Sequence, residues 1–360
     1  MKITSLYILI FKNRCIHFLF MKKFILNLFF FFLPFLIIIF TFIILDPFRI
    51  IYKYDDYSKD MHVISNRDFV SSEMFIKHNE KQQYNSFIFG ASVTLAFRTN
   101  SWKKHLPSTA SPYVFDATGE TTYGIFTKVK YLDKIGTIIN NCIIVICPGN
   151  TFTTDKDQNS HLQVKHPAIA GTSWANFYFT FVKDYLNPWF LKNYFQFLIT
   201  HKYVSSMSGY IENRRIIYDT ISNDITIVDQ EEEIANHPKE YYVKRKNIFF
   251  SRDVSPAPWP RQLSARQIEM YKFIKTVFDK NKTNYKVIIA PMYDQRKMDS
   301  NDLKTVKQIF GNEYVFDFAG KNIFTEKKEN YYEHQHFRPM VGDSILKLIY
   351  TKGSEISDVK

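Results

Sequence analysis

Two short segments that lie far apart in the sequence carry residue types that together could perform acyl transfer. Residues 90–92 read Gly-Ala-Ser and follow an apolar run, so Ser92 stands at the end of a predicted strand. Residues 333–336 read Glu-His-Gln-His and lie in a polar loop before the last predicted helix. A serine hydroxyl is a weak nucleophile and needs a base within about 2.6 to 3.2 Å, which an imidazole can supply. The two segments therefore meet complementary chemical requirements.

The spacing inside the second segment predicts a role for each residue. Glu333 stands three residues before His336, so its carboxylate can hold the Nδ1–H of that ring while Nε2 faces a nucleophile. We predict that Ser92 is the nucleophile, that His336 is the base and that Glu333 orients the base. Asp317, at the end of another predicted strand, is an alternative acid.

Other roles for these residues stay open at this point. Ser92 could be an ordinary helix N-cap, a position that serine favours. His334 and His336 form an H-x-H pair that could bind a metal ion, although no cluster of cysteines or carboxylates elsewhere in the sequence would complete the site. We therefore expect neither a metal nor another cofactor.

The elements that must position these residues follow from the apolar pattern after residue 84. Short apolar runs alternate with helical patterns, which is typical of a parallel sheet covered by helices. Strands are predicted at residues 84–89, 113–115, 142–147, 285–290 and 314–318. Helices are predicted over 264–281 and around 341–349, where apolar residues recur at spacings of three and four. The predicted fold class is α/β, with a parallel sheet in the middle of three α/β/α layers.

Glycines mark the ends of the first three predicted strands. They are Gly90, Gly119 and Gly149, and Asn150 follows the last of them. In open parallel sheets the ligand crevice lies outside the carboxyl ends of the strands. We therefore expect these turns to face the same crevice as Ser92.

The order of these motifs resembles the SGNH (GDSL-type) hydrolase superfamily. The resemblance covers about residues 84–150 and 264–350: Gly-x-Ser, then a glycine, then Gly-Asn, and finally acid-x-x-His before the last helix. It implies a flavodoxin-like domain that acts by acyl transfer through an ester on Ser92. Membrane-tethered domains of this kind occur in cell-envelope polysaccharide O-acetylation, beside a multi-spanning membrane acyltransferase. The resemblance thus implies an envelope polysaccharide or O-acylated glycan as substrate and such an acyltransferase as a partner.

The resemblance also implies an oxyanion hole. In the family, the amide of the serine is joined by a glycine and an asparagine, which would here be the Gly119 N–H and the Asn150 side chain. The sequence departs from the family pattern in that Gly-Ala-Ser replaces Gly-Asp-Ser, Glu333 stands where aspartate is usual, and Pro-Gly-Asn-Thr at 148–151 replaces Gly-x-Asn-Asp. Gly119 could instead serve only a tight turn, and Asn150 could be an ordinary loop residue.

An uncharged stretch near the N-terminus predicts a transmembrane helix. Residues 24–45 carry no charge over 22 positions, and about 20 apolar helical residues cross a bilayer. Pro34 inside the stretch is tolerated in lipid. Basic residues precede it and aspartates follow it, so the positive-inside rule predicts a cytoplasmic N-terminus and, in a bacterial inner membrane, a periplasmic main domain. No small-residue cleavage site follows, so we expect an uncleaved signal-anchor, which could begin at Met1 or at Met21.

These observations divide the chain into four parts. They are a cytoplasmic segment at 1–23, the transmembrane helix at 24–45, a stem at 46–83 and an SGNH-like domain at 84–360. An insertion at about 151–262 interrupts the domain, is densest in aromatic residues over 174–197, and contains a predicted hairpin at 215–229. The aromatic residues could form a core within the insertion, bind an acceptor or contact the membrane surface.

Composition excludes several other classes of protein. With 360 residues, of which 46% are hydrophobic, the chain is too apolar for disorder. The net charge of +12 includes five basic residues and no acid among the first 23 positions, and no dense basic stripe elsewhere indicates nucleic-acid binding. The prediction is a membrane-anchored esterase or O-acyltransferase. The alternative is a non-catalytic protein that keeps the SGNH fold to bind glycan or to scaffold an envelope polysaccharide assembly system.

Overall fold

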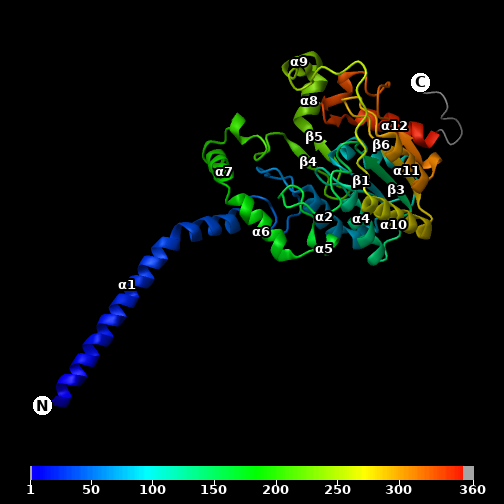
Figure 1. Cartoon of the computed structure of the whole chain (residues 1–360). Helices are drawn as coiled ribbons and strands as arrows, with labels where there is room; N and C mark the ends of the chain where they lie inside the picture. Colours follow the sequence, from blue (N-terminus) through cyan, green and yellow to red (C-terminus); the bar gives the residue numbers. More distant parts are fainter. Residues whose placement is uncertain (1, 352–360) are drawn as a thin grey trace. The chain divides into compact units, whose positions relative to one another are not determined.

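The computed structural model describes residues 2–351, with side chains from residue 21 onward (Figure 1). The chain divides into two compact units, one ending at Lys53 and one beginning at Tyr54. The candidate start at Met1 and the last nine residues of the predicted domain, 352–360, lie outside the described residues.

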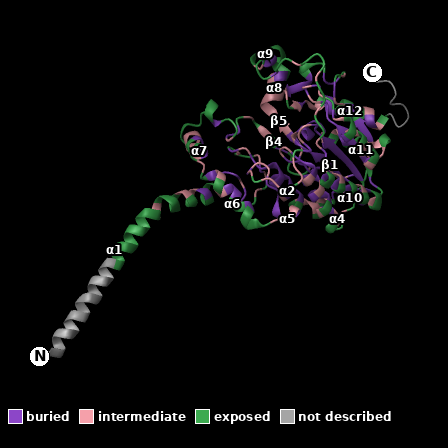
Figure 2. Ribbon diagram, in the orientation of Figure 1, coloured by how far each residue is buried: buried purple, intermediate pink, exposed green. Residues whose placement is uncertain are grey.

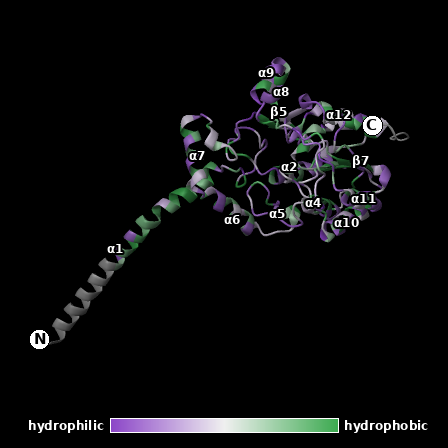
Figure 3. Cartoon of the chain, turned by 45° about the horizontal axis from the view of Figure 1, so that its top comes forward, coloured by the Kyte–Doolittle hydropathy of each residue, from purple (hydrophilic) through white to green (hydrophobic). Residues whose placement is uncertain are grey.

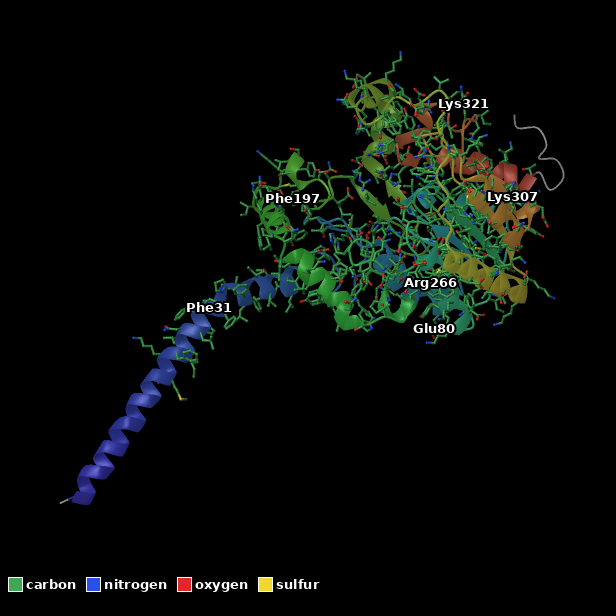
Figure 4. All side chains as sticks on the ribbon, in the orientation of Figure 1. Phe31, Glu80, Phe197, Arg266, Lys307 and Lys321 are labelled. Atoms are coloured by element: carbon green, nitrogen blue, oxygen red, sulfur yellow. The ribbon has the colours of Figure 1, made fainter. Side chains whose placement is uncertain are left out.

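The first unit is dominated by helix α1, Lys2–Leu45, which contains Pro34. Its part from Met21 to Leu45, 25 residues long, is long and apolar enough to cross a membrane. A core helix would bury such side chains, whereas Phe31 is 65% exposed here (Figure 4). Beyond the helix, the carboxylate of Asp46 accepts hydrogen bonds from the backbone N–H groups of residues 50, 51 and 52, which fold the chain into a turn.

The second unit is built on a parallel sheet of five strands in the order β2-β1-β3-β6-β7. The strands are β1 (Ser86–Gly90), β2 (Pro112–Val114), β3 (Asn141–Ile146), β6 (Asn284–Ile289) and β7 (Val315–Asp317). The five predicted strands are confirmed to within two residues at each end. The order is that of doubly wound folds, in which the strand order reverses between β1 and β3 and leaves a crevice at that point.

Helices cover both faces of this sheet. Helices α4 (Thr122–Lys134), α10 (Ala265–Asn281) and α11 (Ser300–Phe310) pack against one another in that order, and α3 (Thr99–Lys103) packs against α12 (Pro339–Thr351). Crossovers between parallel strands are right-handed as a rule, and with this strand order that rule puts the two groups on opposite faces of the sheet. The buried strands between them stand out in Figure 2. The predicted helix over 264–281 is confirmed as α10, which begins at a capping box between Ser264 and Gln267.

Residues 54–83 of the predicted stem lie in the second compact unit. Helix α2, Arg67–Gln82, begins at the N-cap Asn66 and buries Phe75, whose ring stacks on that of Phe115 at 5.1 Å. The apolar period of this helix is hard to detect because its buried side also includes charged Arg67 and Asp68. Arg67 pairs with buried Asp116 at 2.7 Å, and Asp68 pairs with two lysines that are described below. These ion pairs offset the cost of burying the charges.

Between β3 and β6 lie the remaining longer elements. They are α5 (Pro167–Ala170), α6 (Trp174–Tyr185), α7 (Pro188–Thr200), β4 (Ile216–Tyr218), β5 (Ile225–Ile227), α8 (Val228–Asn236) and α9 (Pro238–Lys244). Strands β4 and β5 are antiparallel, and Asn223 in their turn adopts a φ of +61°, so the predicted hairpin is confirmed. A second small pair, β8 (Tyr331–Glu333) and β9 (His336–Phe337), precedes α12. Single 3₁₀ turns occur at Ser92–Ala96 (η1), Ser205–Met207 (η2), Asn312–Tyr314 (η3) and Lys328–Asn330 (η4).

Candidate active site

Ser92 lies where β1 ends and the 3₁₀ turn η1 begins. The preceding Gly90 has a φ of +155°, and a Cβ there would lie 2.8 Å from the carbonyl oxygen of Val145 on β3. Only glycine fits this close approach, since a side chain would push the two strands apart. The turn therefore presents Ser92 at the carboxyl edge of the sheet, beside the reversal of strand order between β1 and β3.

His336 is held against this turn by the end of the chain. It begins β9, opposite Glu333 on β8. The next residue, Phe337, is fully buried and meets the ring of Phe97, which follows η1, edge to face at 5.8 Å. Helix α12 then packs on η1. The hydrophobic contact and the helix together fix the distance between two segments that are far apart in sequence.

Three of the predicted site residues form one hydrogen-bonded chain. The Ser92 hydroxyl lies 2.8 Å from His336 Nε2, and His336 Nδ1 is hydrogen-bonded to a carboxylate oxygen of Glu333. In the tautomer that suits both contacts, Nδ1–H donates to the carboxylate and Nε2 accepts from the hydroxyl. This arrangement can move a proton from serine to imidazole and stabilise the imidazolium that results.

The environment of Glu333 keeps it ionised. Burial of its side chain, which is 21% exposed, raises the pKa, but the charge and the hydrogen bond of His336 together with the Gln335 N–H outweigh burial. The pKa of the Glu333 carboxyl therefore lies below its ordinary value. A carboxylate in this state is suited to orient the ring rather than to donate a proton.

The predicted oxyanion residues lie next to each other at the ends of β2 and β3, the two strands that flank β1. Gly119 has a φ of +59°, and a Cβ on it would lie 3.6 Å from Asn150 Oδ1. No acceptor for the Gly119 N–H is found within residues 2–351. The Asn150 amide already donates one hydrogen bond, of 3.1 Å, to the backbone oxygen of Glu120. Its second N–H is the group that could serve an oxyanion.

Two alternatives, Asp317 as the acid and a metal ion bound by His334 and His336, find no support in the described side chains. Asp317 is exposed at the end of β7, three strands from β1, and accepts a hydrogen bond from the Ala319 N–H. Both ring nitrogens of His336 are engaged by Ser92 and Glu333, which leaves neither for a metal. Over residues 21–351, no group of three or more His, Cys, Asp or Glu side chains is placed to hold a metal ion.

A cluster of buried charges supports the Gly119 turn, and the sequence alone did not indicate it. It consists of Asp68, Glu120, Lys128 and Lys165, and each of these side chains is at most 4% exposed. Lys128 Nζ lies 3.1 Å from Asp68, and Lys165 Nζ lies 2.6 Å from Glu120. Burial raises the pKa of Asp68, but the two lysines outweigh burial and lower it to about 2. The four residues are scattered over almost a hundred positions of sequence, so no local pattern could reveal the cluster.

Trp259 is a second feature that sequence reasoning missed. Gly149 has a φ of +83°, and a Cβ there would lie 2.6 Å from the Trp259 ring. Arg296 stacks on the same ring at 3.9 Å. It also donates hydrogen bonds to the backbone oxygens of Ala257 and Pro258, which belong to the same proline-rich loop as Trp259. The loop is thereby fixed over the turn that carries Asn150. In contrast, a hollow of about 490 Å³ between α10 and α11 includes no candidate site residue.

Replacing Gly342 by alanine is expected to destabilise the protein by about 1 to 3 kcal/mol and to slow any reaction of Ser92. A Cβ on Gly342 would lie 1.9 Å from the backbone oxygen of Ala96, so α12 would have to move away from η1. Thermal unfolding and the rate of labelling at Ser92 measure the two effects. Ser344→Ala, an exposed change in the same helix, is the control and should change neither. A Gly342→Ala protein as stable and reactive as the control would contradict this account of α12.

In comparisons with known proteins, no family model matches this chain and no curated protein matches it.

Proposed function

We propose that this chain is a membrane-anchored, SGNH-like esterase or O-acyltransferase that acts on a cell-envelope glycan through a serine acyl-enzyme. The observation that supports the proposal is the hydrogen-bonded chain of Ser92, His336 and Glu333, with 2.8 Å between Ser92 Oγ and His336 Nε2. That distance lies within the range of a nucleophile and its base. The position of Ser92 at the carboxyl edge of a doubly wound sheet is where such folds bind ligands.

The reaction follows from these contacts in two steps. In the first, His336 takes the Ser92 proton as Oγ attacks the acyl carbonyl, and the same proton is then given to the departing sugar oxygen, which leaves an ester on Ser92. In the second, His336 removes a proton from water or from a sugar hydroxyl as its oxygen attacks the ester carbonyl. His336 then returns that proton to the departing Ser92 Oγ, which releases the acyl product and restores the free serine. The backbone amides of Ser92 and Gly119 and the free N–H of Asn150 would stabilise the oxyanion in both steps. The chemistry requires no cofactor.

The proposed location joins this chemistry to the envelope. The part of helix α1 from Met21 to Leu45 can cross a bilayer, and the basic residues of α1 lie at or before the N-terminal end of that part. This arrangement favours a cytoplasmic N-terminus and a periplasmic main domain. A bacterial inner membrane is the membrane that fits this arrangement. Envelope polysaccharide then lies within reach of the site, and a multi-spanning acyltransferase in the same membrane would supply the acyl group. The aromatic-rich insertion at 151–262 belongs to this SGNH-like domain.

A fluorophosphonate probe tests the proposal, because it forms a covalent bond only with an activated serine. We expect the full chain in detergent or nanodiscs to be labelled, and Ser92→Ala and His336→Ala to lose the label. Circular dichroism and thermal unfolding verify that the variants are folded. Ser344→Ala is the matched control and should label like the unaltered chain. Absence of labelling in the folded, unaltered chain would reject the serine acyl-enzyme.

A non-catalytic glycan-binding or scaffold protein is the second candidate. The observation that favours it is the hydrogen bond from the Asn150 amide to the Glu120 backbone oxygen, which occupies one of the donors that an oxyanion hole would use. Under this alternative the fold is kept but the serine is not activated. Binding of envelope polysaccharide with the same affinity by the unaltered and Ser92→Ala chains, together with no labelling of either, would support it.

A further inference from the structure

Helix α6 carries two apolar stripes, and only one of them is packed. The buried stripe consists of Phe177, Phe181 and Tyr185. The second stripe follows spacings of four, three and four residues. It consists of exposed Ala175 and Phe179, half-buried Val182 and the exposed C-cap residue Leu186. Phe179 is 66% exposed in the middle of this stripe. A helix on the surface of a soluble domain normally shows one apolar stripe, toward the core, so a second stripe that is largely exposed is unusual.

The exposed aromatic residues of the second unit are concentrated in one stretch of its sequence. Six aromatic side chains of this unit are exposed among the described residues, and all but Phe250 lie between Trp174 and Tyr203. The five are Trp174, Tyr178, Phe179, Trp189 and Tyr203. We call these five residues, with Leu186 and Ile199, the aromatic face. Its helices α6 and α7 are neighbours in contact with each other (Figure 2). Such a concentration marks an interaction surface, whereas single exposed apolar residues do not.

The charges beside the aromatic face are basic. Lys183, Lys192 and Lys202 are exposed. The single acidic residue of the stretch 171–204, Asp184, is hydrogen-bonded to the backbone N–H and the ring Nδ1 of His161. Tryptophan and tyrosine favour the headgroup region of bilayers, and lysines attract anionic lipids. Figure 3 shows that hydrophilic and hydrophobic positions alternate along α6 and α7. The exposed aromatic residues and lysines of this stretch match the composition of a membrane-surface segment.

The chain also keeps this unit close to any membrane that α1 crosses. Helix α1 ends at Leu45, and the second unit begins at Tyr54. The eight residues between them can span at most roughly 29 Å even when fully extended. The hydrogen bonds to the Asp46 carboxylate fold part of this connection and shorten it.

From these observations we infer that the aromatic face of α6 and α7 docks into the headgroup region of an anionic lipid bilayer, the same bilayer that α1 crosses. The inference rests on the membrane anchoring in the proposed function, but not on the chemistry at Ser92. Docking at a second point would restrict the rotation of the domain on its short connection and hold the Ser92 site at a constant height above the membrane.

Tryptophan fluorescence tests the inference in the full chain. All four tryptophans, at positions 102, 174, 189 and 259, lie in the second unit, so α1 contributes no signal. The chain is reconstituted in bilayers of phosphatidylcholine and phosphatidylglycerol in which brominated lipids replace ordinary ones. We expect bromine to quench the emission of the unaltered chain and the Trp259→Phe chain. The double variant Trp174→Phe, Trp189→Phe should lose most of this quenching.

A charged substitution supplies a second measurement. Phe179→Asp should reduce quenching of Trp174 and Trp189 at least severalfold, because a carboxylate in the aromatic face opposes contact with anionic lipid. Alkaline carbonate extraction establishes that α1 is inserted, and fluorophosphonate labelling reports on Ser92, so failure of either is distinguished from failure of docking. If α1 is inserted and the unaltered chain shows no quenching, the inference is overturned. An aromatic face that binds another protein instead of lipid would give this result. Equal quenching in the double variant would do the same.

Discussion

Replacing Ser92 by alanine is expected to reduce the turnover of an acyl ester by a factor on the order of 10⁶, and replacing His336 as well should cost almost nothing more. The physical reason is the contact of 2.8 Å between Ser92 Oγ and His336 Nε2, through which the two side chains act as one unit. Without Ser92, His336 has no hydroxyl proton to accept. Without His336, no base receives the proton of Ser92. The measurement is kcat/KM for p-nitrophenyl acetate in both single variants and the double variant.

Glu333 should matter less than either partner. Glu333→Gln keeps an oxygen that can accept the His336 Nδ1–H, so we expect a loss on the order of 10⁴ or smaller, as for the acid of a serine protease triad. Asp317→Asn is the matched control, because Asp317 lies at the end of β7 and takes no part in the hydrogen-bonded chain. Losses for Ser92 and His336 that multiply in the double variant would contradict the idea of a single unit. So would an Asp317→Asn loss as large as that of Glu333→Gln.

The sheet was predictable because its strands are short, continuously apolar and buried on both faces. Residues 142–147 illustrate this point, since β3 lies in the middle of the sheet and each of its residues is buried. A run of that length and composition has few other structures open to it. The carboxyl ends of parallel strands share one edge of the sheet, so the expectation that Ser92 and the turn before Asn150 lie at that edge followed from the strands alone.

The pairing of Glu333 with His336 was predictable from local spacing, whereas the support beneath the site was not. Helix α12 touches η1 at Gly342, and the importance of that glycine emerges only from the distance to Ala96. Helix α2 escaped detection because it buries charged residues, and the acids and lysines that compensate each other come from distant segments. A repeating pattern of apolar residues predicts which side of a helix or strand is buried. The residues of a buried ionic cluster show no such repeat in the sequence, so the pattern does not predict them.

The second large predicted effect is a loss of stability when one member of the buried cluster, Glu120, is neutralised. Glu120→Gln is expected to lower the free energy of unfolding by about 3 kcal/mol, and by up to about 5 kcal/mol if the cluster cannot rearrange. The Glu120 side chain contacts both Lys128 and Lys165, so its neutralisation would leave two buried ammonium groups sharing the carboxylate of Asp68. A loss of about 3 kcal/mol corresponds to a decrease in Tm of roughly 6 to 12 °C.

Thermal unfolding of the full chain measures this loss of stability. Two further variants test whether the loss comes from the buried charges. Glu269→Gln, in an exposed ion pair with Lys272, should change stability by less than about 0.5 kcal/mol. Adding Lys165→Met to Glu120→Gln removes one of the two unpaired cations and should restore part of the loss, which a purely steric effect of glutamine would not allow. Because the Glu120 backbone oxygen accepts the Asn150 amide, Glu120→Gln should also slow labelling at Ser92, and the restored protein should regain part of that labelling. A Glu120→Gln chain as stable as Glu269→Gln would show that the buried charges do not hold the turn.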